Sequence, residues 1–173
     1  DKPGDALVEL RTALDQAPRD AQIMTLMARA HERSGNRDLM GEMLALAVEA
    51  SGNAPDESLR YAAFLLQDEK YLPAEDILKS ALRLQRENVA LLSTLGGVYV
   101  QMADWPRTQQ VVRDLQRVGT PEAEGIANEL TARMFAARDQ AAELENLLGA
   151  LAEGEGDLQA GASIIRLRLA QGD

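Results

Sequence analysis

Residues 55–88 read PDESLRYAAFLLQDEKYLPAEDILKSALRLQREN, and this stretch decides the fold. Its apolar residues recur at helical spacing in two runs with a polar break between them, which predicts two helices joined by a tight turn. Its landmarks recur 34 residues away, since Leu78 matches Leu44 and Leu10 at the same place in the second helix. A fixed period of this length predicts a repeat array of helix pairs.

The composition agrees with a helical array. Of the 173 residues, 46% are hydrophobic but only 3% aromatic, and much of the remainder of the apolar set is alanine. Small side chains favour close helix packing, whereas a β-sandwich needs more β-branched and aromatic residues. Cysteine is absent, so there are no disulfides and no thiolate chemistry. A chain without cysteine is compatible with either the cytoplasm or a cell-envelope compartment.

The charge and hydropathy exclude two classes of partner. The net charge of −10 argues against a nucleic-acid-binding surface, because such surfaces concentrate basic residues. No apolar run approaches the roughly 18 residues that a membrane-spanning helix requires. We therefore expect neither nucleic-acid binding nor direct membrane insertion.

The 34-residue frame predicts ten helices in an all-α chain. Gly4 and Asp5 resemble the start of the first helix, Asp20 a cap of the second, and Thr120 with Pro121 the start of the eighth. The last two helices are expected at about 139–152 and 158–170. The resulting organisation is a half-repeat at 1–18, full repeats at about 20–54, 55–88, 89–120 and 121–155, and a half-repeat at 157–173. Helix pairs that each contact only their neighbours form a solenoid.

The two ends of the array carry apolar side chains. The chain begins at Asp1 rather than methionine, and the frame leaves one helix without its partner at each end. We therefore expect a fragment of a longer repeat protein. Self-association through the end helices is the alternative, because large exposed apolar patches mark contact sites.

The repeats resemble the tetratricopeptide repeat (TPR) family over nearly the whole chain. The family has a small residue midway along each first helix, and an aromatic residue is favoured three positions later. A glycine at the turn follows, which Gly35 matches while Glu69 and Ala103 depart from it. The small positions are Ala28, Ala62, Gly96 and Ala132, and the aromatic positions carry His31, Leu65, Tyr99 and Phe135. The resemblance implies a right-handed superhelix of antiparallel helix pairs whose first helices line a concave groove for peptides or protein segments.

The sequence carries no catalytic or metal-binding constellation, and we expect no cofactor. His31 is the only histidine, which excludes a histidine-rich metal site and makes a Ser-His-Asp triad improbable. It occupies the aromatic position of its repeat, so we predict a packing or interhelical hydrogen-bonding role.

The resemblance places candidate binding residues on the groove side of the first helices. The middle of the groove is apolar and arginines stand towards both ends, which favours a partner segment with an apolar centre and acidic flanks. The alternative is that these arginines only pair with acids on their own helices, as Arg29 would with Glu32. Some TPR domains hold a carboxyl terminus with a set of lysine and asparagine residues. In this chain the matching positions carry Thr25, Arg29, Leu59 and Ala63, so that clamp is absent in its usual form. The candidates are Gln22, Thr25, Arg29, Arg33, Leu59, Ala63, Leu66, Gln67, Ser93, Gly97, Val100, Gln101, Glu129, Arg133 and Arg166.

Three functions compete at this point. The first is a non-catalytic scaffold that binds a peptide or protein segment in the groove. The second is a structural spacer or self-assembly section of a longer solenoid, and the third is the regulatory region of an enzyme whose catalytic domain lies outside this chain. By analogy alone, bacterial envelope-assembly and secretion factors have this pattern, which favours the cell envelope.

Overall fold

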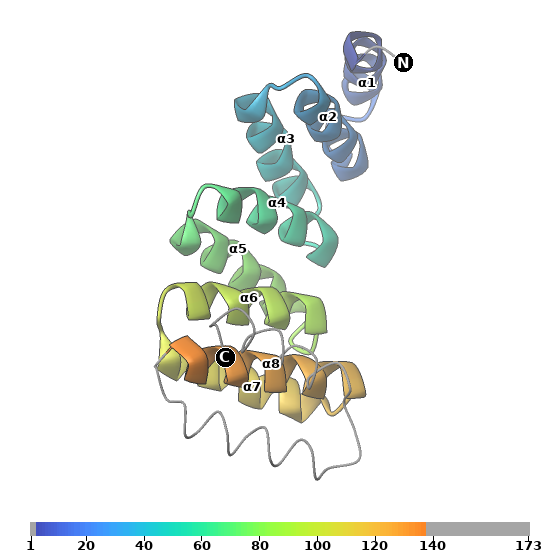
Figure 1. Ribbon diagram of the computed structural model, residues 1–173. Helices are drawn as coiled ribbons and strands as arrows, with labels where there is room; N and C mark the ends of the chain where they lie inside the picture. Colours follow the sequence, from blue (N-terminus) through green and yellow to red (C-terminus); the bar gives the residue numbers. More distant parts are fainter. Residues whose placement is uncertain (1–2, 138–173) are drawn as a thin grey trace. The chain divides into compact units, whose positions relative to one another are not determined.

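The computed structural model describes residues 3–137, which form α-helices joined by short turns without any strand (Figure 1). The all-α fold class is therefore confirmed for this part of the chain. The two helices predicted at 139–152 and 158–170, and Arg166, lie outside the described residues. The eight described helices are α1 (Pro3–Gln16), α2 (Ala21–Arg33), α3 (Arg37–Ala50), α4 (Pro55–Gln67), α5 (Tyr71–Leu84), α6 (Val89–Gln101), α7 (Trp105–Val118) and α8 (Pro121–Ala137).

The chain divides into two compact units, Asp1–Arg86 and Glu87–Asp173. In the first unit each of the helices α1 to α4 packs against the next one along the chain, so that α5 is the last of the series. In the second unit α6, α7 and α8 all pack against one another. Each unit is therefore built from neighbour contacts, as expected for helical repeats.

The turns inside the helix pairs repeat the same hydrogen bonds. The amides of Asn36, Lys70 and Asp104 donate to the carbonyls of the residues five positions earlier, at 2.9, 3.0 and 2.9 Å. These acceptors are residues 31, 65 and 99, which are the aromatic positions of the 34-residue frame. This bond from the second residue after the C-cap defines the Schellman motif, so the period in the sequence is also a period in the backbone.

The Schellman motif requires a left-handed residue, and the three turns supply it in different ways. Gly35, Glu69 and Ala103 have φ angles of +72°, +55° and +54°. Glu69 and Ala103 therefore replace the glycine of the family pattern but adopt the same left-handed conformation. Only glycine adopts it without steric cost.

We expect Ala103→Gly to raise the free energy of unfolding by up to about 1 kcal/mol, because relief of the left-handed strain exceeds the added entropy of the unfolded chain. The reciprocal change, Gly35→Ala, should lower it by about 1 kcal/mol. A Cβ at Gly35 would meet nothing within 4 Å, so only backbone strain acts there. Urea unfolding of the two variants provides the measurement. The same sign of change in both variants would contradict this account.

The helix starts agree with the caps predicted from the sequence, with one exception. The Asp20 carboxylate accepts from the amides of Gln22 and Ile23 at 2.8 and 3.1 Å, and the Thr120 hydroxyl accepts from the Ala123 amide at 3.2 Å. The predicted start at Gly4 and Asp5 is wrong, because α1 begins at Pro3. Proline suits the first position of a helix, and Asp5 then lies in the first turn, where a carboxylate interacts favourably with the helix dipole.

The core of each unit is made from small residues interleaved with leucine. Ala62 of α4 has no exposed surface, and neither do Ala74, Leu78 and Ala81 of α5. His31 is 3% exposed, so its predicted packing role is confirmed. No residue of helix α1 from Gly4 to Gln16 is buried, and Val8 is 63% exposed. Self-association through the end helices stays a prediction.

Candidate functional site

A hollow of about 270 Å³ lies between α2, α3 and α4 in the first unit. Helices α2 and α4 are the first helices of two successive pairs, so this hollow is on the side where the resemblance places the groove. Its lining is formed by Thr25, Ala28, Arg29 and Glu32 of α2, Met40 and Leu44 of α3, and Arg60, Ala63, Phe64 and Gln67 of α4. We call it the α2–α4 pocket.

Both long walls of the α2–α4 pocket have the same helical spacing. Residues 25, 28, 29 and 32 on α2 and residues 60, 63, 64 and 67 on α4 each follow the pattern i, i+3, i+4, i+7. This pattern gives one continuous stripe along one side of a helix. The pocket is therefore the gap between two stripes, and Met40 and Leu44 of α3 complete its lining.

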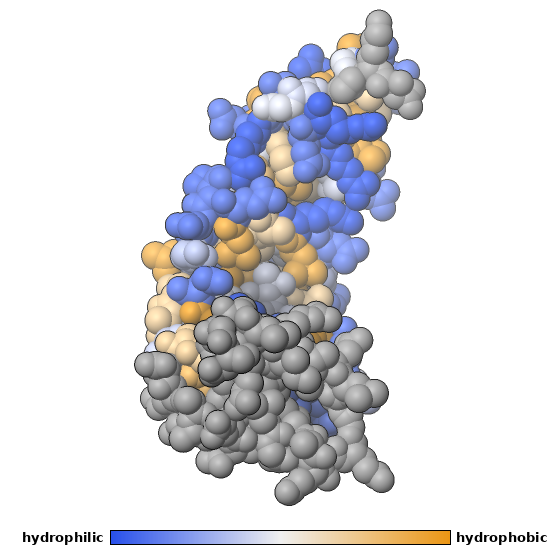
Figure 2. Space-filling view, in the orientation of Figure 1, coloured by the Kyte–Doolittle hydropathy of each residue, from blue (hydrophilic) through white to orange (hydrophobic). Residues whose placement is uncertain are grey.

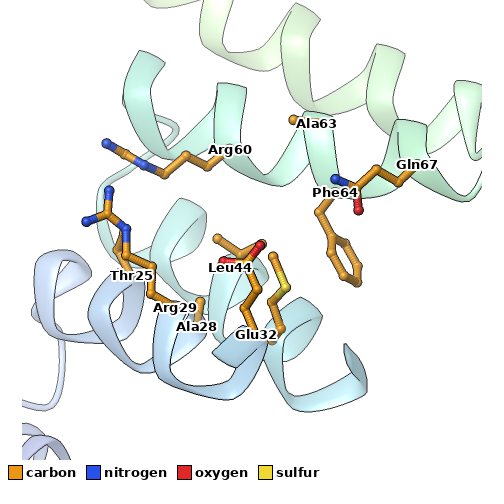
Figure 3. A pocket seen from close by; sticks show the side chains of 10 residues that line it. Thr25, Ala28, Arg29, Glu32, Leu44, Arg60, Ala63, Phe64 and Gln67 are labelled. Carbon is orange, nitrogen blue, oxygen red and sulfur yellow. The ribbon is translucent and has the colours of Figure 1, made fainter. Parts of the chain in front are cut away.

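The arginines of the pocket lie together at one end of it (Figure 3). The side chains of Thr25, Arg29 and Arg60 lie at one end, and Phe64 and Gln67 lie at the other. Figure 2 shows hydrophilic side chains covering much of the first unit on one face, with hydrophobic side chains visible between them. The site thus offers positive charge at one end and an apolar surface beside it.

The structure brings four of the predicted groove residues together in the α2–α4 pocket: Thr25, Arg29, Ala63 and Gln67. Thr25 is nevertheless buried, with 8% of its surface exposed, whereas the other three are exposed. The remaining candidates of this unit do not line the pocket. Gln22 and Arg33 are exposed, and Leu59 and Leu66 are half-buried.

The candidates of the second unit lie away from its core. Ser93, Gly97, Val100, Glu129 and Arg133 are half-buried, and Gln101 is exposed. A Cβ at Gly97 would meet nothing within 4 Å, in contrast to the neighbouring Gly96. These positions are accessible, and their part in binding stays a prediction.

Sequence reasoning did not choose Ala28, Met40, Leu44, Arg60 or Phe64 of the lining as binding candidates. A signal for Arg60 was present, because Ala63 and Gln67 stand three and seven residues after it. The spacing that joins Ala63 to Gln67 extends back to Arg60 on the same side of α4.

An arginine of α3 contacts the residues at the Phe64 and Gln67 end of the pocket. The Arg37 guanidinium donates to Gln67 Oε1 at 3.0 Å and to the Asp68 carboxylate at 2.5 Å, and it lies 4.7 Å from the centre of the Phe64 ring. Its hydrogen bond lowers the pKa of Asp68 below the ordinary value, with Lys70 adding to the effect. Arg37 therefore holds Phe64 and Gln67 at the end of α4.

The pocket arginines do not pair with the acids of their own helices. Among the described residues, the ion pairs involve Arg37, Lys70, Lys79, Arg107 and Arg117. Arg29 and Glu32, which the alternative interpretation pairs, have no such contact. That interpretation does not describe the arrangement around α2.

Two other kinds of site are absent from residues 3–137. No group of three or more histidine, cysteine or acidic side chains is placed to hold a metal ion there. In the same residues, no helix has the length and apolar character needed to cross a membrane.

Comparison with known proteins places the fold among TPR-type structures. No protein-family model matches the chain, and no curated protein sequence matches it. A crystal structure of MamA protein matches with a TM-score of 0.68 and 13% identity, covering 98% of this chain and 87% of that chain. The pilF protein of Pseudomonas aeruginosa matches with a TM-score of 0.60 and 19% identity, covering 99% of this chain and 86% of that chain. Both are TPR-type proteins, so the chain has a TPR-like fold.

Proposed function

We propose that this chain is a non-catalytic protein-binding scaffold of the TPR family that holds a peptide or protein segment against α2 and α4. The observation that carries the proposal is the α2–α4 pocket, which lies between the first helices of two successive pairs. Binding pockets in proteins combine an apolar lining with a few placed polar groups, and this one has both. An extended or helical segment is the natural occupant of a gap between two parallel stripes.

The exposure of the pocket residues supports the proposal. Arg29, Arg60, Ala63 and Gln67 are all exposed although they line a common hollow. Their side chains are therefore accessible to a partner, while the alanines of the core hold the helices in place. The domain organisation as a single array of repeats belongs to the same proposal.

A photo-reactive amino acid at Ala63 should cross-link the full chain to its partner segment in the native host, because this exposed position lines the pocket. The same amino acid at Asp76, an exposed position on α5 outside the pocket, is the matched control. Peptide mass spectrometry of the cross-linked product should identify one short segment from Ala63 and not from Asp76. In a second variant, Ala63→Trp fills the pocket and should abolish co-purification of the protein containing that segment.

Equal cross-linking of one protein from both positions would reject the pocket as its site. Co-purification that survives Ala63→Trp would reject it as well. Circular dichroism of Ala63→Trp confirms that the helices remain folded, so a loss of binding reports the filled pocket.

A further inference from the structure

One hydroxyl in the α2–α4 pocket lacks the bond that its counterparts make. The other threonines in the interiors of the described helices donate to the carbonyl four residues earlier; they are Thr12, Thr94, Thr108 and Thr131. The Thr25 hydroxyl, on a residue only 8% exposed, has no hydrogen-bond partner. A buried hydroxyl without a partner is unfavourable, and an acceptor atom on a ligand in the pocket would satisfy it.

Thr25 differs from the other residues that have a buried polar atom without a partner. Among the described residues, a buried atom of His31 and one of Ser58 also lack partners. Neither of these residues lines the α2–α4 pocket, whereas Thr25 does. Thr25 is therefore the one residue of the three that combines an unused donor with a place in the lining of a hollow.

Two guanidinium groups lie at the same end of the pocket as Thr25 (Figure 3). Arg29 stands four residues after Thr25 on α2, and Arg60 comes from α4 on the opposite wall. Neither forms an ion pair with any described residue. Two unpaired positive charges that face one hollow repel each other, and an anion bound between them removes that repulsion.

The charge of the pocket selects among anions. Glu32 is the only acidic residue among those lining the hollow, and with Arg29 and Arg60 it leaves a formal charge of +1 there. A carboxylate with a single charge matches this balance, and planar guanidinium groups bind carboxylates with two parallel hydrogen bonds. Glu32 would repel a second negative charge, which disfavours a phosphate group.

The surface beside the arginines takes an apolar side chain. Ala28, Met40, Leu44 and Phe64 supply carbon atoms to the pocket lining. The part of α2 that lines the pocket, residues 25–32, lies inside a helix that runs from Ala21 to Arg33. Helix α4 likewise extends from Arg60 back to Pro55, so at the arginine end both helices continue beyond the pocket. A bound segment can therefore continue past the arginines, which favours a side-chain carboxylate over a chain terminus.

We propose that Thr25, Arg29 and Arg60 bind the side-chain carboxylate of one aspartate or glutamate in the partner segment. An adjacent apolar residue of that segment packs against Ala28, Leu44 and Phe64. This rests on the proposed function and adds to it the chemistry of the recognised residue. The site selects a single acidic residue with an apolar neighbour, and not a generally acidic segment.

The test titrates the ¹⁵N-labelled full chain with three blocked tripeptides and follows its amide resonances. The first peptide is acetyl-Leu-Glu-Leu-amide, the second acetyl-Leu-Gln-Leu-amide, and the third acetyl-Leu-Gln-Leu with a free terminal carboxylate. We expect the first to shift the amides of residues 25–32 and 60–67, with binding about tenfold weaker for the second and third.

Variants then assign the binding to the three residues. Arg60→Gln and Thr25→Val should each weaken binding of the glutamate peptide about tenfold, while Thr25→Ser should retain it. Arg83→Gln removes one positive charge from an exposed position on α5 outside the pocket and should leave binding unchanged. Because the Thr25 hydroxyl has no partner in the free protein, Thr25→Val should not lower the melting temperature.

Each other outcome overturns the inference in a distinguishable way. Equal binding of the glutamate and glutamine peptides leaves an apolar pocket and rejects carboxylate recognition, while the proposed scaffold function stands. Binding of the third peptide alone assigns the site to a chain terminus. If no tripeptide shifts the pocket amides, carboxylate recognition is rejected, and only the Ala63 cross-linking experiment decides the scaffold function. A fall in melting temperature for Thr25→Val would assign its hydroxyl a structural role.

Discussion

Replacing Leu78 with alanine is expected to lower the free energy of unfolding by about 2–5 kcal/mol, the usual range for a fully buried leucine. Leu78 on α5 has no exposed surface, and the fully buried alanines Ala74 and Ala81 are near it in sequence on the same helix. These small neighbours have no long side chains that could move into the space left by the leucine. The cavity therefore persists and adds to the lost apolar burial.

Leu72→Ala is the matched control, since it makes the same chemical change on the same helix at a position that is 63% exposed. Its effect should stay within about 0.5 kcal/mol. Urea unfolding monitored by circular dichroism gives both values. Similar losses for the two variants would show that α5 is not seated as described.

The second large effect is expected at Gly96, where three helices of the second unit meet. A Cβ at this position would lie 2.4 Å from Leu130 Cδ1 of α8 and 3.2 Å from Val111 Cγ1 of α7. Leu130 and Val111 are 2% and 3% exposed, so neither has free space to move into. Gly96→Leu should therefore destabilise the chain by about 1–3 kcal/mol through overpacking, even after the gain in helix propensity.

Gly97 provides the control for helix propensity. It follows Gly96 in α6, and a Cβ there would meet nothing within 4 Å. Gly97→Leu should raise the stability by up to about 1 kcal/mol through propensity alone. The difference between the two variants isolates the steric term.

A double variant tests which contact is responsible. If Leu130 is the atom group in conflict, Gly96→Leu combined with Leu130→Ala should cost less than the sum of the two single changes. Additive losses would place the conflict elsewhere. A Gly96→Leu variant as stable as Gly97→Leu would contradict the close approach of α6 and α8.

The sequence by itself determined the helices and the turns between them. The 34-residue period predicted the pairs that are now observed as α2 with α3, α4 with α5, and α6 with α7. The residue types Asp20 and Thr120 also predicted the two caps, because capping depends on residues within one turn of the helix start. Local spacing is sufficient for such features, since every interaction involved spans at most a few residues.

The turns within the helix pairs were predicted from the sequence, but their backbone conformation was not. The loss of glycine at Glu69 and Ala103 weakened the match to the family at those positions, yet both residues keep the left-handed conformation. The reason is that the hydrogen bonds of the Schellman motif and the packing of the flanking helices fix the backbone. The residue at the left-handed position of a turn can therefore differ between repeats while the backbone geometry stays the same.

Only the tertiary structure decided how the α2–α4 pocket is composed. The repeat frame transfers Thr25 and Arg29 of α2 to Leu59 and Ala63 of α4, which are equivalent positions on equivalent helices. A pocket between two successive repeats instead uses different sides of those helices, so the α4 wall begins at Arg60. The unused Thr25 hydroxyl and the unpaired Arg29 also depend on side-chain placement across helices. A sequence period relates equivalent residues, but contact between helices joins residues that are not equivalent, and this is why packing was needed to define the site.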